Sequence, residues 1–304
     1  MFPELSEWWL GVALACLGAL GFAGQYLFVR LGTVDGDVDH AVLIALGCNV
    51  AILAPPVAVR YEPPYVQLFS PTAALAFVAA GMVGMFAARI LLFRSVDVLG
   101  ANLTSPVVAS NVLFATVIAV VVLGERLTPT HALGIVLVVA GVAIVSWETA
   151  AANGGRTLGE ATALLALPIG AAAFIGVEPI FISIGLSAGT PVLPGLLLMA
   201  ATASVAFVGY LAVRRSRSVL PPVTRSTGWL VAAGVSTTVG FLGYFGALSL
   251  APVVLVVPLI QLAPLIVVVV SFVAFPRHLE RLTWRVVASA VVVVVGASLV
   301  SLSG

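Results

Sequence analysis

The sequence has 304 residues and a formal net charge of +1, and 62% of its residues are hydrophobic while 8% are charged. Soluble globular domains carry about 25% charged residues, so the composition excludes that class. A nucleic-acid-binding surface is not expected from so balanced a charge. Runs such as 291–295 are apolar on every face, whereas strands of a membrane barrel alternate apolar and polar residues. These features predict an all-α polytopic membrane protein.

Ten apolar segments are expected along the chain, each near the roughly 20 residues that an α-helix needs to cross a bilayer. Tryptophan is typical of membrane interfaces, and all five tryptophans lie at the proposed ends. A polar bridge at 148–156 separates two sets of five. The segments are 8–31, 40–59, 71–94, 99–123, 129–147, 158–185, 191–213, 228–249, 252–275 and 284–302.

A literal repeat divides the chain into two units. The quartet Glu125–Thr128 returns as Glu280–Thr283, an offset of 155 (280 minus 125). We therefore expect five-helix repeats at 1–150 and 151–304. Because five is odd, the second repeat must start on the opposite side of the membrane, so the repeats are inverted. Inverted repeats are typical of secondary transporters, whose substrate site lies near the bilayer midplane between the halves.

Thr128 and Thr283 close the repeated quartets, and Thr128 is followed by Pro129. Threonine is a common N-cap residue, and proline is favoured at the first helical position. The quartets are therefore interpreted as helix boundaries and not as catalytic motifs.

Residues 123–146 begin Leu-Gly-Glu-Arg-Leu-Thr and continue as a glycine-containing apolar helix. Together with the five-plus-five count, this pattern resembles the EamA-like branch of the drug/metabolite transporter superfamily over essentially the whole chain. The sequence departs from the family pattern at Pro276–Leu279, where a longer segment replaces the usual short Gly-Glu ending. The resemblance implies a multi-pass cell-membrane exporter of small metabolites, such as amino acids or drugs.

The same resemblance implies alternating access with proton coupling. A small-molecule substrate and the lipid bilayer are the expected partners. Neither a cofactor nor a metal ion is expected, and the oligomeric state stays open.

Two ionisable residues lie inside predicted spans, where such groups are functional candidates by default. Glu178 is about seven residues from the end of its span, and Pro179 follows it and removes a backbone donor. Because an apolar environment favours the neutral acid, Glu178 is a candidate proton carrier, with a buried structural hydrogen bond as the alternative. Arg89 lies about five residues from the end of segment 71–94, so its long side chain could instead reach the interface. If both face one cavity, they bracket a zwitterion from opposite leaflets.

Uncharged polar residues within the spans are candidates for lining the same cavity, although such residues often only join neighbouring helices. Gln25 aligns with Glu178 at an offset of 153 (178 minus 25). Prolines near the middle of the fourth and ninth segments indicate broken helices, which in transporters mark the binding region. The other candidates are Asn102, Asn111, Thr237, Tyr244 and Gln261, with Thr104 and Thr238 beside them.

Two other functions stay open at this stage. An intramembrane enzyme acting on lipid needs metal ligands or a histidine dyad near a membrane face, and only the loop Asp35–His40 offers such residues. A receptor or scaffold needs no central polar cavity. The orientation also stays open. Arginines in the loops after the seventh and ninth segments favour external termini by the positive-inside rule, whereas the family resemblance implies internal termini.

Overall fold

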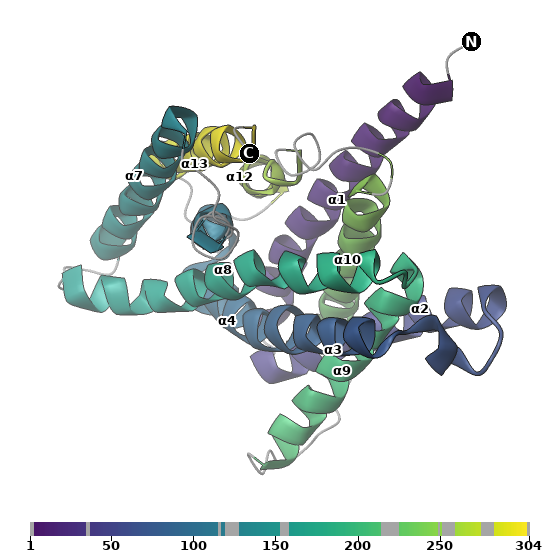
Figure 1. The fold of residues 1–304 in the computed structure, drawn as a ribbon. Coiled ribbons are helices and arrows are strands. Elements are labelled where there is room, and N and C mark those ends of the chain that lie inside the picture. Colours follow the sequence, from purple (N-terminus) through teal and green to yellow (C-terminus); the bar gives the residue numbers. More distant parts are fainter. Residues whose placement is uncertain are drawn as a thin grey trace.

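The structure is a computed structural model, and it describes residues 3–34, 37–114, 117–118, 128–152, 158–213, 225–248, 250, 259–274 and 283–302. Within these residues every regular element is a helix (Figure 1). The elements are α1 (Pro3–Thr33), α2 (Val38–Arg60), η1 (Tyr65–Leu68), α3 (Pro71–Ala80), η2 (Gly81–Ala88), α4 (Arg89–Leu99), α5 (Ala101–Val108), α7 (Pro129–Ala152), α8 (Leu158–Ser187), α9 (Val192–Val213), α10 (Arg225–Leu248), α12 (Ala263–Ala274) and α13 (Trp284–Leu302).

Membrane-spanning helices account for most of the described chain. Six helices are long and apolar enough to cross a bilayer, and three shorter apolar helices accompany them at 132–141, 263–274 and 284–299. This arrangement confirms the predicted class of all-α polytopic membrane protein.

The third segment is longer than the sequence predicts. α3, the π-helical stretch η2 and α4 follow one another without a break, so this helix ends at Leu99 and not at Arg94. Arg94 is accommodated inside the helix because its Nη2 donates hydrogen bonds to the Tyr210 hydroxyl at 3.0 Å and to Asp39 Oδ1 at 3.4 Å. Gly100 then turns the chain into α5 with a φ of 86°, which glycine adopts without strain. Arg89 therefore lies ten residues from the helix end (99 minus 89), deeper than the sequence suggested.

The two halves pack through matching helices. α1 lies antiparallel to α10, since Gly21 meets Gly240 and Gly32 meets Leu230. The equivalent pair is α8 against α3–η2–α4, where Gly185 meets Phe77. α3 is the third span and so runs in the direction of α1, which means that α8 runs opposite to α1. This geometry confirms the inverted repeat.

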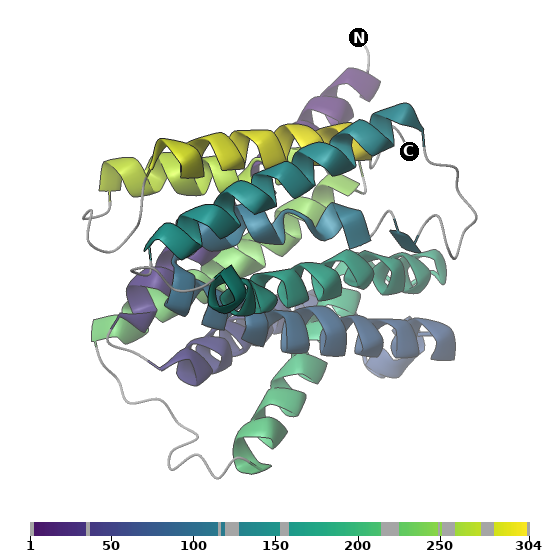
Figure 2. The same ribbon diagram turned by 90° about the vertical axis from the view of Figure 1, so that its left-hand side faces the viewer.

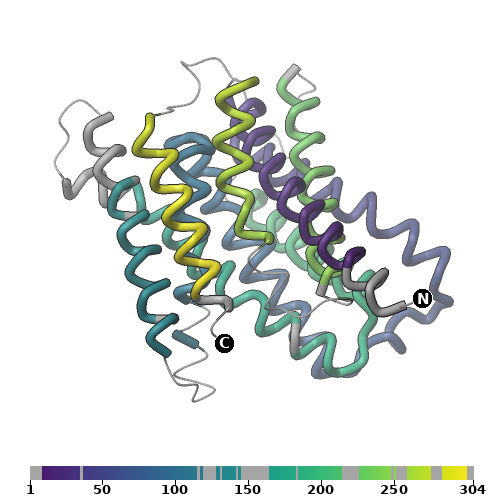
Figure 3. The backbone as a smooth tube through the Cα atoms, turned by 90° about the horizontal axis from the view of Figure 1, so that it is seen from above, coloured from purple at the N-terminus to yellow at the C-terminus, as the bar shows by residue number. Residues whose placement is uncertain are grey.

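The last spans of the two halves also pack against each other. α7 and α13 lie side by side (Figures 2 and 3), and Gly141 and Gly296 bring their backbones together. A Cβ on Gly296 would meet the Gly134 carbonyl oxygen. Small residues thus allow close packing where lipid supplies no hydrophobic driving force between helices.

Side-chain caps fix several helix starts. Ser70 Oγ accepts from Ala73 N at 3.1 Å, and Asp37 Oδ1 accepts from Asp39 N at 2.7 Å. Thr283 Oγ1 accepts from Val286 N at 3.3 Å, so the predicted cap of the last helix is confirmed. The other members of the second quartet, and 125–127 of the first, lie outside the described residues.

Candidate functional site: a cavity between the repeats

A cavity of about 160 Å³ lies between the two halves. The first, third and fourth segments of each half supply its described walls. The walls are mostly apolar and aromatic, with a few polar groups, which is the usual make-up of a small-molecule site. The lining residues are Phe22, Gln25, Tyr26, Gly84, Ala88, Arg89, Leu92, Ser105, Val108, Ala109, Asn111, Ile175, Glu178, Pro179, Ile182, Phe241, Tyr244, Phe245, Ile260, Gln261, Ala263 and Pro264.

Glu178 projects from α8 into this cavity. The residue is only 6% exposed, and its Oε1 is buried without a hydrogen-bond partner among the described residues. Its carboxyl group fills the space beside Gly84, where a side chain would overlap it. A buried carboxyl oxygen with no partner is energetically costly unless a proton or a ligand satisfies it. The alternative role considered for Glu178, a buried structural hydrogen bond, therefore does not apply to its Oε1.

Arg89 enters the cavity from the start of α4. It is 4% exposed and lines the cavity, so the alternative of a side chain that extends to the interface does not describe it. Its guanidinium carbon lies 6.0 Å from the centroids of both the Phe93 and Phe241 rings. Nη1 lies 2.9 Å from the side-chain oxygen of Asn49 when that amide faces the guanidinium. Arg89 is thus a buried cation held by one neutral acceptor and two aromatic rings.

Arg89 and Glu178 line the same cavity and are close enough to interact electrostatically. No ion pair joins these two described side chains. Glu178 lies beside Gly84, and Arg89 follows Gly84 by five residues, which is about 7.5 Å along a helix axis. The two side chains therefore meet the third span at different points along its length, while both line the same cavity.

Gln25 and Thr237 meet where α1 packs on α10. Gln25 lines the cavity, and the Thr237 hydroxyl lies 2.7 Å from its Oε1 and 2.8 Å from the Ala233 carbonyl oxygen. Thr237 itself stands behind this wall. Tyr244, about two turns further along α10, lines the cavity beside Phe245. Each half therefore contributes polar and aromatic groups to the same space.

Two helix breaks meet at the cavity. The backbone turns at residues 109–110, after α5, and again at 261–262, before α12. Gln261 Nε2 donates to the Ala109 carbonyl oxygen at 3.2 Å and to Asn111 Oδ1 at 3.4 Å. The predicted breaks in the fourth and ninth segments thus contact each other, and exposed backbone carbonyls at such breaks can be satisfied by side chains.

Asn102 and Thr104 do not line this cavity. Both side chains are fully buried, and Thr104 Oγ1 lies 2.9 Å from Ser95 Oγ. Gly100 redirects the chain just before them, so both residues lie near the start of α5, whereas the lining residues of this segment begin at Ser105. The acidic loop is also accounted for in part, since Asp37 caps α2 and Asp39 pairs with Arg94. Asp35 lies outside the described residues, and no group of metal-ligating side chains was found among the described ones.

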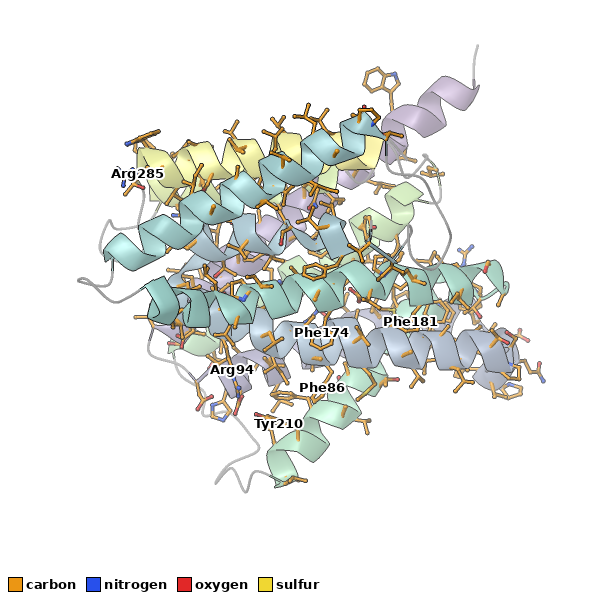
Figure 4. All side chains as sticks on the ribbon, turned by 60° about the vertical axis from the view of Figure 1, so that its left-hand side comes forward. Phe86, Arg94, Phe174, Phe181, Tyr210 and Arg285 are labelled. Atoms are coloured by element: carbon orange, nitrogen blue, oxygen red, sulfur yellow. The ribbon has the colours of Figure 1, made fainter. Side chains whose placement is uncertain are left out.

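Further along α4 than Arg89, polar contacts join four helices at one face of the protein. Arg94 of α4 reaches Tyr210 of α9 and Asp39 of α2, and Tyr210 packs against Phe86 and Phe207 (Figure 4). Arg30 Nη1 donates to the Asp97 carbonyl oxygen at 2.8 Å at the same face. These contacts tie α1, α2, α4 and α9 together where the spans end.

Sequence reasoning missed three features of the site. Asn49 was not singled out, because an amide in an apolar helix carries no signal of what it contacts. Ser105 Oγ is buried in the cavity wall without a partner among the described residues. The π-helical stretch η2 ends directly before Arg89. π-Helical insertions are frequent at functional sites, but periodicity alone does not reveal them.

Comparison with known proteins gives matches of two kinds. The sequence model described as the EamA-like transporter family matches residues 9–147 and 162–302. A solved structure described only as "Crystal structure of protein" is similar in fold, with a TM-score of 0.63 and 18% sequence identity over 97% of this chain and 98% of that one. No curated protein matches the sequence.

Proposed function

Because the chain belongs to the EamA-like transporter family, we propose that it is a secondary active transporter that exports small zwitterionic metabolites, such as amino acids or drugs, in exchange for protons. The repeats 1–150 and 151–304 would rock against each other around the cavity to give alternating access. The protein would act in the cell membrane, and it would carry its substrate without chemical change.

The observation that carries this proposal is the Glu178 carboxyl group, whose buried Oε1 has no partner among the described residues and faces the cavity. An ammonium group of a substrate or a proton can each neutralise this acid. Since the two compete for one group, substrate binding on one side of the membrane expels a proton there. Arg89, at a different depth, is then available for the carboxylate of the same substrate.

The lining residues indicate the rest of the substrate. Leu92, Ile175, Ile182 and Ile260 join five aromatic rings around the polar groups. We therefore expect an amino acid with an apolar side chain to bind more tightly than one with a polar side chain.

The test is transport in proteoliposomes with an imposed pH gradient, comparing the parent with Glu178→Gln over a panel of amino acids and amphipathic drugs. The parent should move leucine against its gradient when a proton gradient is imposed. Glu178→Gln should lose this response. The matched control is Glu62→Gln, which changes an exposed acid in the loop after α2.

Proton-driven leucine movement that is equal in the parent and in Glu178→Gln would contradict the role of Glu178. Movement of no compound in the panel by the parent would contradict the substrate class.

A further inference from the structure

We propose that Asn49 and Thr238 are positioning residues that hold Arg89 as the carboxylate subsite of the cavity. This inference rests on the proposed function, because it assigns one end of the substrate to one residue of that site. Neither residue lines the cavity, and each is 1% exposed, so both must act through Arg89.

A chain of hydrogen bonds crosses three helices behind the cavity wall. With its oxygen facing Arg89, Asn49 of α2 accepts from Nη1 at 2.9 Å and donates from Nδ2 to Thr238 Oγ1 at 2.7 Å and to the Ala45 carbonyl oxygen at 3.2 Å. Thr238 of α10 then donates to the Gly234 carbonyl oxygen at 2.9 Å. The opposite amide orientation would turn NH₂ hydrogens toward the guanidinium, which has only donors. Because the Thr238 hydroxyl proton is donated to Gly234, its oxygen accepts from Asn49 Nδ2, and the Asn49 oxygen is left to face Arg89.

The neutrality of Asn49 matters as much as its position. A carboxylate at that place would pair with Arg89 and cancel its charge, as Asp39 does in part for Arg94 at the protein face. An amide oxygen orients the guanidinium without neutralising it. Guanidinium groups bind carboxylates through two parallel N–H donors, and one bond from Asn49 leaves such a pair for the ligand.

Thr238 is adjacent to Thr237, whose hydroxyl lies 2.7 Å from Gln25 Oε1. One turn of α10 thus contacts Gln25 directly and Arg89 through Asn49, and both Gln25 and Arg89 line the cavity. The hydroxyl of Thr238, and not its volume, carries the proposed effect, so removing the hydroxyl alone should loosen Arg89.

The experiment measures binding of three matched probes to the purified full-length protein. Leucine carries both charges, leucinamide lacks the carboxylate, and 4-methylpentanoate lacks the amine. The variants are Thr238→Val, Thr238→Ser and Asn49→Asp. Ser204→Ala is the control, because it removes a comparable hydroxyl bond to a helix carbonyl on α9, away from the cavity wall.

The parent should bind leucine more tightly than leucinamide. Thr238→Val should raise the leucine Kd roughly tenfold, which corresponds to about 1.4 kcal/mol, and leave the leucinamide Kd unchanged. Thr238→Ser should behave as the parent. Asn49→Asp should weaken leucine and 4-methylpentanoate at least as strongly and leave leucinamide unchanged or tighter, because the new carboxylate occupies Arg89.

Equal changes for leucine and leucinamide in Thr238→Val and Asn49→Asp, or no change in either variant, would overturn the positioning role while leaving the proposed substrate class intact. Failure of the parent to bind any of the three probes would overturn the substrate class and this inference together. A Thr238→Val protein that does not fold leaves the decision to Asn49→Asp, because a merely structural role does not weaken leucine binding while leaving leucinamide binding unchanged or tighter.

Discussion

Gly84 and Glu178 share one space between α8 and η2, since a Cβ on Gly84 would overlap the Glu178 carboxyl group. The glycine is therefore required by the position of the acid and not by its own backbone conformation. This contact joins the third span of one repeat to the first span of the other, at the wall of the cavity.

Replacing Gly84 with alanine should displace the Glu178 carboxyl group from its place in the cavity wall. We expect initial transport rates in proteoliposomes to fall about tenfold or more, because misplacing a binding group by about 1 Å can cost that much. The matched control is Gly47→Ala, another glycine inside a helix, where an added Cβ meets no atom within 4 Å. Parent-like rates for Gly84→Ala would show that Glu178 tolerates the shift.

Gly21 lies against the backbone of Gly240, where α1 packs on α10. Gly21→Ala should separate these helices and lower thermal stability in detergent, with a cost of about 1–3 kcal/mol for overpacking. Gly209→Ala on α9 meets no neighbouring atom and serves as the control. Alanine is favoured over glycine inside a helix by about 1 kcal/mol. Gly209→Ala should therefore melt at the same temperature as the parent or at a higher one.

Gln261 joins the two broken helices through the Ala109 carbonyl oxygen. Gln261→Leu should leave that buried acceptor without this donor, at a cost of about 1–3 kcal/mol. We expect a several-fold fall in the transport rate with the protein still folded, as judged by its elution on gel filtration. Gln67→Leu, at an exposed position in η1, should transport as the parent does. Similar rates in both variants would mean that the contact between the breaks does not matter for transport.

The orientation can be read from single cysteines at two exposed helix ends. Ser187 ends α8 at the face where the termini are expected, and Val213 ends α9 at the arginine-rich face. In a background that lacks Cys16 and Cys48, the positive-inside rule predicts that Ser187→Cys reacts with an impermeant maleimide in intact cells. Val213→Cys should react only after permeabilisation. The reverse pattern would place the termini inside.

Some features of the site could be predicted from single positions in the sequence. Glu178 and Arg89 stood out because a charge within an apolar span is costly and needs a reason. Gln25 stood out through its alignment with Glu178, and Gln261 through the prolines near it. Asn102 was misplaced by the same reasoning, since the turn at Gly100, which leaves Asn102 near the start of α5, has no signal in a count of residues along a segment.

The sequence by itself determined the membrane class, the two repeats and their inversion, because composition, segment length and an odd span count are properties of the chain alone. Only the tertiary structure decided that α3 continues to Leu99, that Gly84 makes room for Glu178 and that Asn49 faces Arg89. Apolar helices resemble one another in sequence, so their partners and rotations are set by side-chain packing and by a few buried hydrogen bonds. Those contacts join residues more than 90 positions apart in the case of Gly84 and Glu178 (178 minus 84), beyond the reach of any local pattern.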